Sequence, residues 1–226
     1  MVARYPTGTV RLCAFDLDHT LVCTPLDLKA MAADMRVYLE RCGAGPPERP
    51  ERYRVGELLQ FCRSRVPALE PALWALALER ERQAMDAATL EPGALAAVAG
   101  ARRLGFVTAL WTNNAGTVTR GALERLGLAE HFDLVVTRDE MRALKPDPDG
   151  WRVIAGHVNG AARHAYMVGD SWVDGLAATT AGIPFIAYRA NAAELSRWKI
   201  EPVANLADLA TLPDWLAGAI APEGRR

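Results

Sequence analysis

Short apolar runs alternate with longer amphipathic segments along most of the chain. The first run, residues 10–16 (VRLCAFD), is too short for a helix and ends in an acid, so it predicts a buried strand. Similar runs follow, and helical patterns that often stop at a glycine lie between them. Strands are expected at 10–16, 106–111, 133–137, 164–170 and 183–188, helices at 94–105, 115–127, 147–160 and 173–182, and one or two shorter helices at 206–209 and 213–220.

This alternation predicts an α/β fold, in which a parallel sheet is covered by helices on both faces. Ligands of such sheets bind beyond the carboxyl ends of the strands. Polar residues follow several of the predicted strands, and the candidate chemistry is therefore sought at that edge of the sheet.

The stretch from residue 22 to residue 90 breaks the alternation, because it offers no convincing strand. Its patterns are helical at 26–43, 55–66 and 68–88, with a loop rich in glycine and proline after the first. We therefore predict a helical domain of residues 22–90, inserted into an α/β core domain formed by residues 1–21 and 91–226.

Composition narrows the class of protein. The chain has 226 residues, half of them hydrophobic, which is enough for a core domain with a smaller insert. Its net charge of −1 lacks the basic excess of a nucleic-acid binder. No run approaches the ~20 apolar residues of a membrane helix, and the N-terminus shows no secretory signal. A cytoplasmic protein is expected, without nucleic-acid or membrane partners, and its four cysteines lack zinc-ligand spacing.

The strongest chemical signal is the pair Asp16 and Asp18, at the end of the first predicted strand. Two carboxylates two residues apart at a strand-to-loop junction can converge on one point. Adjacent acids repel one another unless a cation lies between them or one carries a proton. The pair indicates either a metal site or a nucleophile beside a general acid. The alternative is that Asp16 caps a turn and that Asp18 is solvated.

Two further groups could contact a phosphate. Thr112 and Asn113 follow the second predicted strand, where a hydroxyl and the N–H groups of a helix start can bind an anion. They could equally be the cap of the next helix. Lys145 precedes Pro146, which restricts its backbone. Its ammonium could offset the charges of a phosphate and a carboxylate, or it could simply be solvated.

Asp170 and Asp174 follow the fourth predicted strand, four residues apart around a turn into a helix. Carboxylate oxygens of this kind suit Mg²⁺. The alternative is that Asp170 caps the helix while Asp174 stabilises its first turn. Apart from Asp16 and Asp18, no single group identifies the chemistry by itself. The order in which all of these groups follow the predicted strands is the stronger signal.

That order resembles the haloacid dehalogenase-like (HAD) hydrolase superfamily, in particular its phosphoglycolate phosphatase-like branch with a helical cap. The resemblance covers nearly the whole chain and implies a Rossmann-like parallel sheet of order 3-2-1-4-5, with the insert as the cap domain. The four motifs of the family are similar to Asp16-x-Asp18-x-Thr20, Thr112, Lys145 and Gly169-Asp170-Ser171-x-x-Asp174.

The resemblance also implies a role for each site residue. Asp16 would attack phosphorus and form an aspartyl-phosphate, and Asp18 would act as general acid and then general base. Thr112 and Lys145 would bind the phosphoryl group, and Asn113, beside Thr112, is a further candidate for that role. The implied ligands of Mg²⁺ are Asp16, the main-chain carbonyl of Asp18, Asp170 and, in support, Asp174.

Two residues depart from the usual pattern of the family. His19 stands where Gly or Asn is more usual, and Asn114 stands where small residues are frequent. Neither departure removes a catalytic group. His19 could touch the substrate or the cap, or it could be a variant of which only the backbone matters.

The resemblance implies a magnesium-dependent phosphatase for a small phosphate monoester of the phosphoglycolate, sugar phosphate or nucleotide type. A phosphomutase of the same fold and a non-catalytic phospho-ligand-binding protein are the alternatives, while Asp18 argues against a dehalogenase. A monomer or a homodimer is compatible with the sequence. An arginine of the insert could clamp a substrate carboxylate; the candidates are Arg36, Arg41, Arg49, Arg52, Arg54, Arg63 and Arg65.

Overall fold

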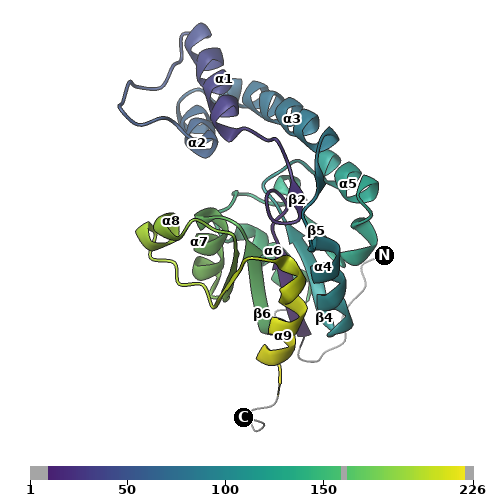
Figure 1. Cartoon of the computed structure of the whole chain (residues 1–226). Coiled ribbons are helices and arrows are strands. Elements are labelled where there is room, and N and C mark those ends of the chain that lie inside the picture. The colour runs from purple at the N-terminus through teal and green to yellow at the C-terminus, as the bar shows by residue number, and fades with distance from the viewer. Residues whose placement is uncertain (1–9, 159–161, 222–226) are drawn as a thin grey trace. The chain divides into compact units, whose positions relative to one another are not determined.

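The computed structural model describes residues 10–158 and 162–221. Contacts divide the chain into two compact units, one made of the residues up to Cys23 and from Thr89 onward, the other of Thr24–Ala88. The first contains the sheet and the second is helical, as the ribbon in Figure 1 shows.

Among the described residues, six parallel strands form the large sheet, in the order β5-β4-β1-β6-β7-β8. The predicted α/β class and the order 3-2-1-4-5 are confirmed for the first five strands in chain order, and the sixth extends the sheet beyond them. The strands are β1 (Val10–Phe15), β4 (Phe106–Trp111), β5 (Leu134–Val136), β6 (Ala162–Gly169), β7 (Phe185–Tyr188) and β8 (Ala204–Leu206).

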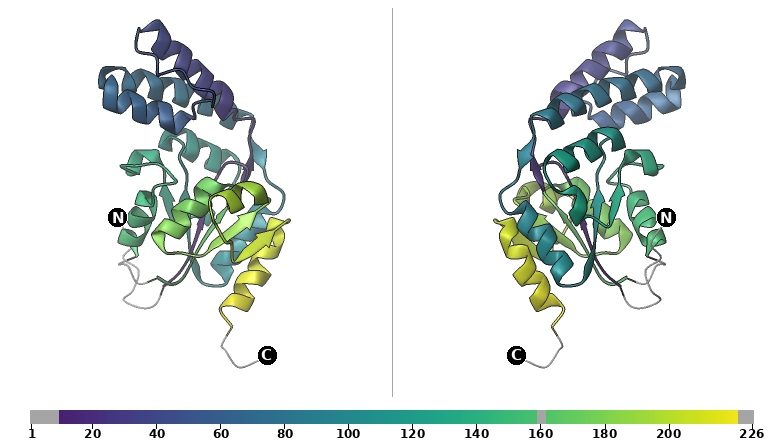
Figure 2. Two further views of the ribbon diagram at one scale, coloured as in Figure 1. Left: turned by 90° about the vertical axis from the view of Figure 1, so that its left-hand side faces the viewer. Right: turned by 90° about the vertical axis from the view of Figure 1, so that its right-hand side faces the viewer.

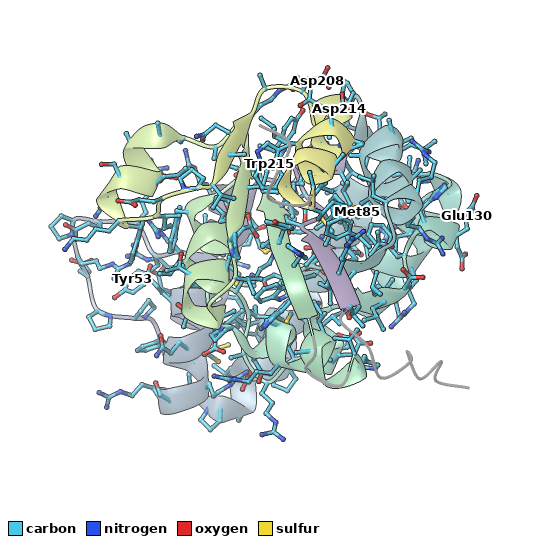
Figure 3. The ribbon with its side chains drawn as sticks, turned by 90° about the horizontal axis from the view of Figure 1, so that it is seen from below. Tyr53, Met85, Glu130, Asp208, Asp214 and Trp215 are labelled. Carbon is cyan, nitrogen blue, oxygen red and sulfur yellow. The ribbon has the colours of Figure 1, made fainter. Side chains whose placement is uncertain are left out.

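Helices cover both faces of this sheet (Figure 2), which is why β1 reads as an unbroken apolar run. The residues from Leu12 to Phe15 are fully buried. Trp215 of α9, labelled in Figure 3, packs edge-to-face on Tyr166 of β6, with ring centroids 5.2 Å apart. The helices are α4 (Ala94–Arg103), α5 (Gly116–Arg125), α6 (Asp149–His157), α7 (Trp172–Ala181), α8 (Ala192–Arg197) and α9 (Leu212–Ala219).

The register of the central strands brings their carboxyl ends level. Phe15 of β1 lies beside Leu110 of β4 and beside Val168 of β6. The residues that follow these strands therefore meet at one edge of the sheet, as expected for a parallel α/β fold.

Several sequence predictions are wrong in detail. Residues 206–209 do not form a helix, because Leu206 ends β8 and Leu209 begins a 3₁₀ turn, Leu209–Thr211. β8 and α8 were missed because three to six residues are too few to display a period. The last two residues of the helix predicted at 147–160 lie outside the described residues.

The stretch from residue 22 to residue 90 was predicted to lack strands, and this is wrong at both ends. β2 (Val22–Cys23) pairs antiparallel with β3 (Thr89–Leu90). Strands of two residues carry no alternation, so nothing in the sequence pattern could reveal them. The two strands tie together the points where the chain leaves the sheet unit and returns to it.

The helical unit contains α1 (Leu28–Arg41), α2 (Val55–Arg65) and α3 (Glu70–Asp86). Asp27 caps α1, and its carboxylate accepts hydrogen bonds from the N–H groups of Lys29 and Ala30. The unit has a core of its own, which includes Met31, Met35, Leu39, Leu58, Cys62 and Leu73. In the part of the chain that the structure describes, no helix has the length and apolar character needed to cross a membrane.

Candidate active site

Asp16 is the first residue after β1, and the sheet holds its main chain. Its N–H donates to the carbonyl of Val168, at 2.9 Å, so Asp16 continues the pairing of β1 with β6. The residue is only 7% exposed. Its Oδ1 accepts a hydrogen bond from Nζ of Lys145 at 2.6 Å, and the hydroxyl of Thr20 lies 3.5 Å from Oδ2. The carboxylate is thus fixed at the middle of the sheet edge.

Lys145 is buried between two carboxylates. Its Nζ lies 2.6 Å from Oδ1 of Asp16 and 2.6 Å from Oδ1 of Asp174. Burial alone would lower the pKa of Lys145, but the charges of Asp16 and Asp174 outweigh it and raise the pKa above its ordinary value. Lys145 therefore stays protonated, and the alternative of a solvated lysine is wrong.

Asn113 determines the path of the loop that carries Lys145. Its side-chain Nδ2 donates to the main-chain carbonyl of Lys145 at 3.0 Å, and its Oδ1 accepts from the main-chain N–H of Lys145 at 2.9 Å. The loop runs from β5 to α6 and has no periodic pattern of its own. Asn113 therefore orients Lys145 through its main chain. The sequence did not predict this pair of hydrogen bonds. Its predicted role as a phosphate ligand stays a prediction.

Asp174 lies in the first turn of α7 and is held by a capping box. Its Oδ2 accepts from the hydroxyl of Ser171 at 2.6 Å and from the N–H of Ser171 at 3.3 Å. Ser171, not Asp170, is the N-cap of this helix, so the alternative of Asp170 as the cap is wrong. A Cβ on Gly169 would lie 2.5 Å from Cβ of Asp174, which explains the glycine at this position.

The acids Asp16, Asp170 and Asp174 form a cluster that could bind a metal ion, because one carboxylate oxygen of each lies within 4.8 Å of the others. Burial, with the neighbouring Asp174, raises the pKa of Asp170 to about 7. The same causes raise the pKa of Asp16 well above its ordinary value, in spite of Lys145. One ammonium thus only partly offsets three carboxylates. An oxygen-rich cluster with excess negative charge fits a hard divalent cation.

Asp18 lies in the loop after β1 and is half-buried. Its Oδ2 accepts a hydrogen bond from Nδ2 of Asn114 at 2.7 Å. The next residue, His19, has a φ of 57° and an exposed side chain, while its N–H donates to Val22 O at 2.8 Å. The left-handed backbone favours Gly and Asn and also admits His. The conformation at His19 is thus one that histidine can adopt, and a contact of its side chain with the substrate or the cap stays a prediction.

Thr112 is buried at the end of β4. Its N–H donates to the carbonyl of Val136 at 3.0 Å, and its Oγ1 accepts from the N–H of Asn114 at 3.2 Å. The N-cap of α5 is Ala115, without a side-chain capping bond, so neither Thr112 nor Asn113 serves as the cap. That alternative is wrong, and the role of Thr112 as a phosphate ligand stays a prediction.

A comparison with protein families agrees with this geometry. The model of the family described as haloacid dehalogenase-like hydrolase matches residues 10–182, which include every candidate site residue. The chain belongs to this family. As a HAD-like hydrolase it is expected to assemble its chemistry at the carboxyl ends of the strands, where Asp16, Thr112 and Asp170 are found.

Two curated relatives of this HAD-like hydrolase are named phosphoglycolate phosphatase. The protein of Rhodobacter capsulatus is 29% identical over 152 residues, which is 65% of this chain and 66% of that protein, so the chain spans slightly less than two thirds of it. The protein of Cereibacter sphaeroides is 33% identical over 188 residues, 76% of this chain and 81% of that one. A solved hydrolase from Pseudomonas syringae has a TM-score of 0.69 at 20% identity, covering 93% and 99% of the two chains. The last likeness concerns the fold alone.

Three contacts in this HAD-like site were not foreseen from the sequence. They are the hydrogen bond from Asn114 to Asp18, the hold of Asn113 on the lysine loop, and the close approach of Gly169 to Asp174. Gly169 carried a usable signal, because a glycine directly before an acid at a strand end indicates close packing. Asn113 and Asn114 carried no such signal in the sequence, because their partners Lys145 and Asp18 are distant along the chain.

Proposed function

We propose that this protein is a phosphatase that hydrolyses a small phosphate monoester through an aspartyl-phosphate on Asp16, with Mg²⁺ as its cofactor. The observation that carries the proposal is the buried ammonium of Lys145, 2.6 Å from the carboxylates of both Asp16 and Asp174. Phosphoryl transfer depends mainly on positioning and on stabilising negative charge. A fixed, permanently charged lysine beside a buried carboxylate suits that requirement.

The first half of the reaction transfers the phosphoryl group to the protein. A carboxylate oxygen of Asp16 attacks phosphorus, and the bond from phosphorus to the ester oxygen breaks. Asp18 gives its proton to that oxygen, which leaves as an alcohol. Lys145 stays protonated throughout and, with Thr112 and Asn113 in their predicted roles, binds the phosphoryl oxygens.

The second half regenerates the protein. A water molecule attacks phosphorus and gives a proton to Asp18, which now acts as the base. The bond between phosphorus and Asp16 breaks, and inorganic phosphate is released. Both aspartates then have their starting protonation states, so the cycle balances.

The cluster of carboxylates fits a magnesium ion. Asp16, Asp170 and Asp174 offer oxygen atoms within 4.8 Å of one another, and the main-chain carbonyl of Asp18 is the further ligand that the family resemblance implies. When bound, the ion would neutralise negative charge on the carboxylates and on the phosphoryl oxygens.

Phosphoglycolate is the first substrate to test, because the two curated relatives described above are named phosphoglycolate phosphatase. We propose that the helical insert predicted at residues 22–90, which contains the helical unit Thr24–Ala88, acts as a cap domain and selects the substrate. Three of its seven candidate arginines already pair with glutamates on the surface. These pairs are Arg36–Glu40, Arg49–Glu57 and Arg63–Glu70.

The decisive experiment measures phosphate release from a panel of esters with and without Mg²⁺. The panel contains p-nitrophenyl phosphate, phosphoglycolate, sugar phosphates and nucleotides. Release that requires Mg²⁺ and is lost in Asp16→Asn supports the proposal. Asp214→Asn is the matched control, because it makes the same change at an exposed acid of α9. Transfer of the phosphoryl group to a second sugar hydroxyl would indicate a phosphomutase, and no turnover of any ester by folded protein would contradict the proposal.

A further inference from the structure

Consecutive asparagines after β4 point to different partners. Asn113 holds the main chain of Lys145, whereas Nδ2 of Asn114 lies 2.7 Å from Oδ2 of Asp18. An amide nitrogen can only donate and a carboxylate can only accept, so the direction of this bond is set by chemistry. The two side chains thus link β4 to the lysine on one side and to the proposed acid on the other.

The main chain of Asn114 is fixed from two sides. Its N–H donates to the hydroxyl of Thr112 at 3.2 Å, and its carbonyl accepts from the N–H of Arg138 at 3.1 Å. Thr112 follows β4 and Arg138 follows β5, so two neighbouring strands determine where Asn114 lies. The residue is only 5% exposed, and packing therefore restricts its side-chain rotamers.

The loop that carries Asp18 holds its main chain. Asp18 follows β1 by three residues, and the loop turns at His19, whose N–H donates to the carbonyl of Val22 at 2.8 Å, while the N–H of Val22 donates to the carbonyl of Leu17 at 3.0 Å. These bonds fix the backbone of the loop but do not by themselves choose the side-chain torsions of Asp18. Asn114 is an anchored donor that can select one rotamer of the carboxylate.

We propose that Asn114 is a positioning residue for the general acid and base, and that it holds the Asp18 carboxylate through Oδ2. The inference rests on the proposed phosphatase function and adds a residue to it. Misplacement of a catalytic group by about 1 Å can cost about 100-fold in rate.

The test uses the leaving group of the ester. An alkoxide needs a proton to leave, whereas p-nitrophenolate is stable enough to leave without one. The first turnover is followed by rapid mixing, because Asp18 also acts as a base in the second half with every substrate. Asn114→Ala is expected to slow the first turnover of an alkyl phosphate by about 10- to 100-fold. It should leave that of p-nitrophenyl phosphate nearly unchanged, with little effect on KM.

Two companion variants separate positioning from general damage. Asn114→Ser keeps a polar side chain that is too short to reach Asp18, and it should show the same dependence on the leaving group. Thr119→Val is the matched control, because Thr119 is buried in α5 and, among the described residues, its hydroxyl has no hydrogen-bond partner. It should leave both first-turnover rates unchanged. A thermal melt of each variant establishes that it is folded.

A double-mutant cycle gives the second readout. In an Asp18→Ala background, Asn114→Ala should have no further effect on the alkyl ester, because the residue acts only through Asp18. An equal loss with both esters, or a full loss added to that of Asp18→Ala, would overturn the inference while leaving the phosphatase function intact. If the wild-type protein hydrolyses no ester, both proposals fail together.

Discussion

The ion pairs at the edge of the sheet differ in their setting from the ion pairs on the surface of the helical unit. In the sheet unit, the side chains of Lys145 and Asp174 are 2% and 3% exposed and lie in direct contact. In the helical unit, charges pair on the surface, as in Arg82 with Glu79, where both side chains are about half exposed. Water already stabilises the exposed charges of Arg82 and Glu79. The buried charges of Lys145 and Asp174 depend on neighbouring protein groups instead.

This difference shows where the fold tolerates unfavourable electrostatics. Burying three carboxylates around one ammonium costs free energy of folding. The packing of a sheet edge does not itself require such a cluster. Exposed pairs, by contrast, lie on helices whose stability comes from a separate apolar core around Met35 and Leu58. The buried cluster is therefore best explained by chemistry, and the surface pairs by solubility and helix support.

The largest expected effect comes from removing the buried cation. Lys145→Met leaves Asp16 and Asp174 without their shared partner, and breaking a buried pair in this way typically costs about 3–5 kcal/mol. The free energy of unfolding, measured in urea, should fall by that order, and ester hydrolysis should be lost. Lys29→Met makes the same change at an exposed residue of α1 and should alter neither quantity appreciably. Equal stability losses in the two variants would contradict the contrast between the units.

Metal binding should produce the next largest effect. At a Mg²⁺ concentration 100 times its Kd, a single site stabilises the folded protein by about 2.7 kcal/mol. The melting temperature should therefore rise with Mg²⁺, and Asp170→Asn should remove most of that rise. Asp214→Asn, on the exposed surface of α9, should keep the full response. A rise that persists unchanged in Asp170→Asn would place the ion elsewhere.

A smaller loss of stability is expected from Gly169→Ala. The new Cβ would lie 2.5 Å from Cβ and 2.6 Å from Cγ of Asp174, so Asp174 must shift from the position in which it contacts Lys145. Overpacking of this kind costs about 1–3 kcal/mol, and activity should fall together with stability. Gly156→Ala in α6 is the control, because nothing lies within 4 Å of its Cβ position. It should be neutral or slightly stabilising, and a similar loss there would refute the packing argument.

The sequence pattern predicted the sheet edge well because strands buried on both faces leave continuous apolar runs. Asp16 and Asp170 could be placed from those runs alone. Lys145 could not, since its loop has no period and its burial depends on contacts with acids 129 and 29 residues away in the chain. Asn114 is a similar case, because its partner Asp18 lies 96 residues away.

The strands that the pattern missed share one physical cause, which is their length. β2, β3 and β8 have two or three residues, so alternation cannot be recognised in them. His19 differs, because its residue type did carry a signal: histidine is among the few non-glycine residues that are enriched in left-handed backbone conformations. Its φ of 57° lies in that region.

The smallest effect is expected in the helical unit. Arg36→Met removes the pair with Glu40, one turn along α1, whose side chains are 38% and 46% exposed. Exposed pairs at this spacing contribute about 0.3–0.5 kcal/mol, and salt weakens them further. Urea unfolding at low and at high salt should therefore differ little between Arg36→Met and the wild type. A loss that approached that of Lys145→Met would mean that charge in the helical unit is as structurally demanding as charge at the sheet edge, and the contrast between the two units would no longer hold.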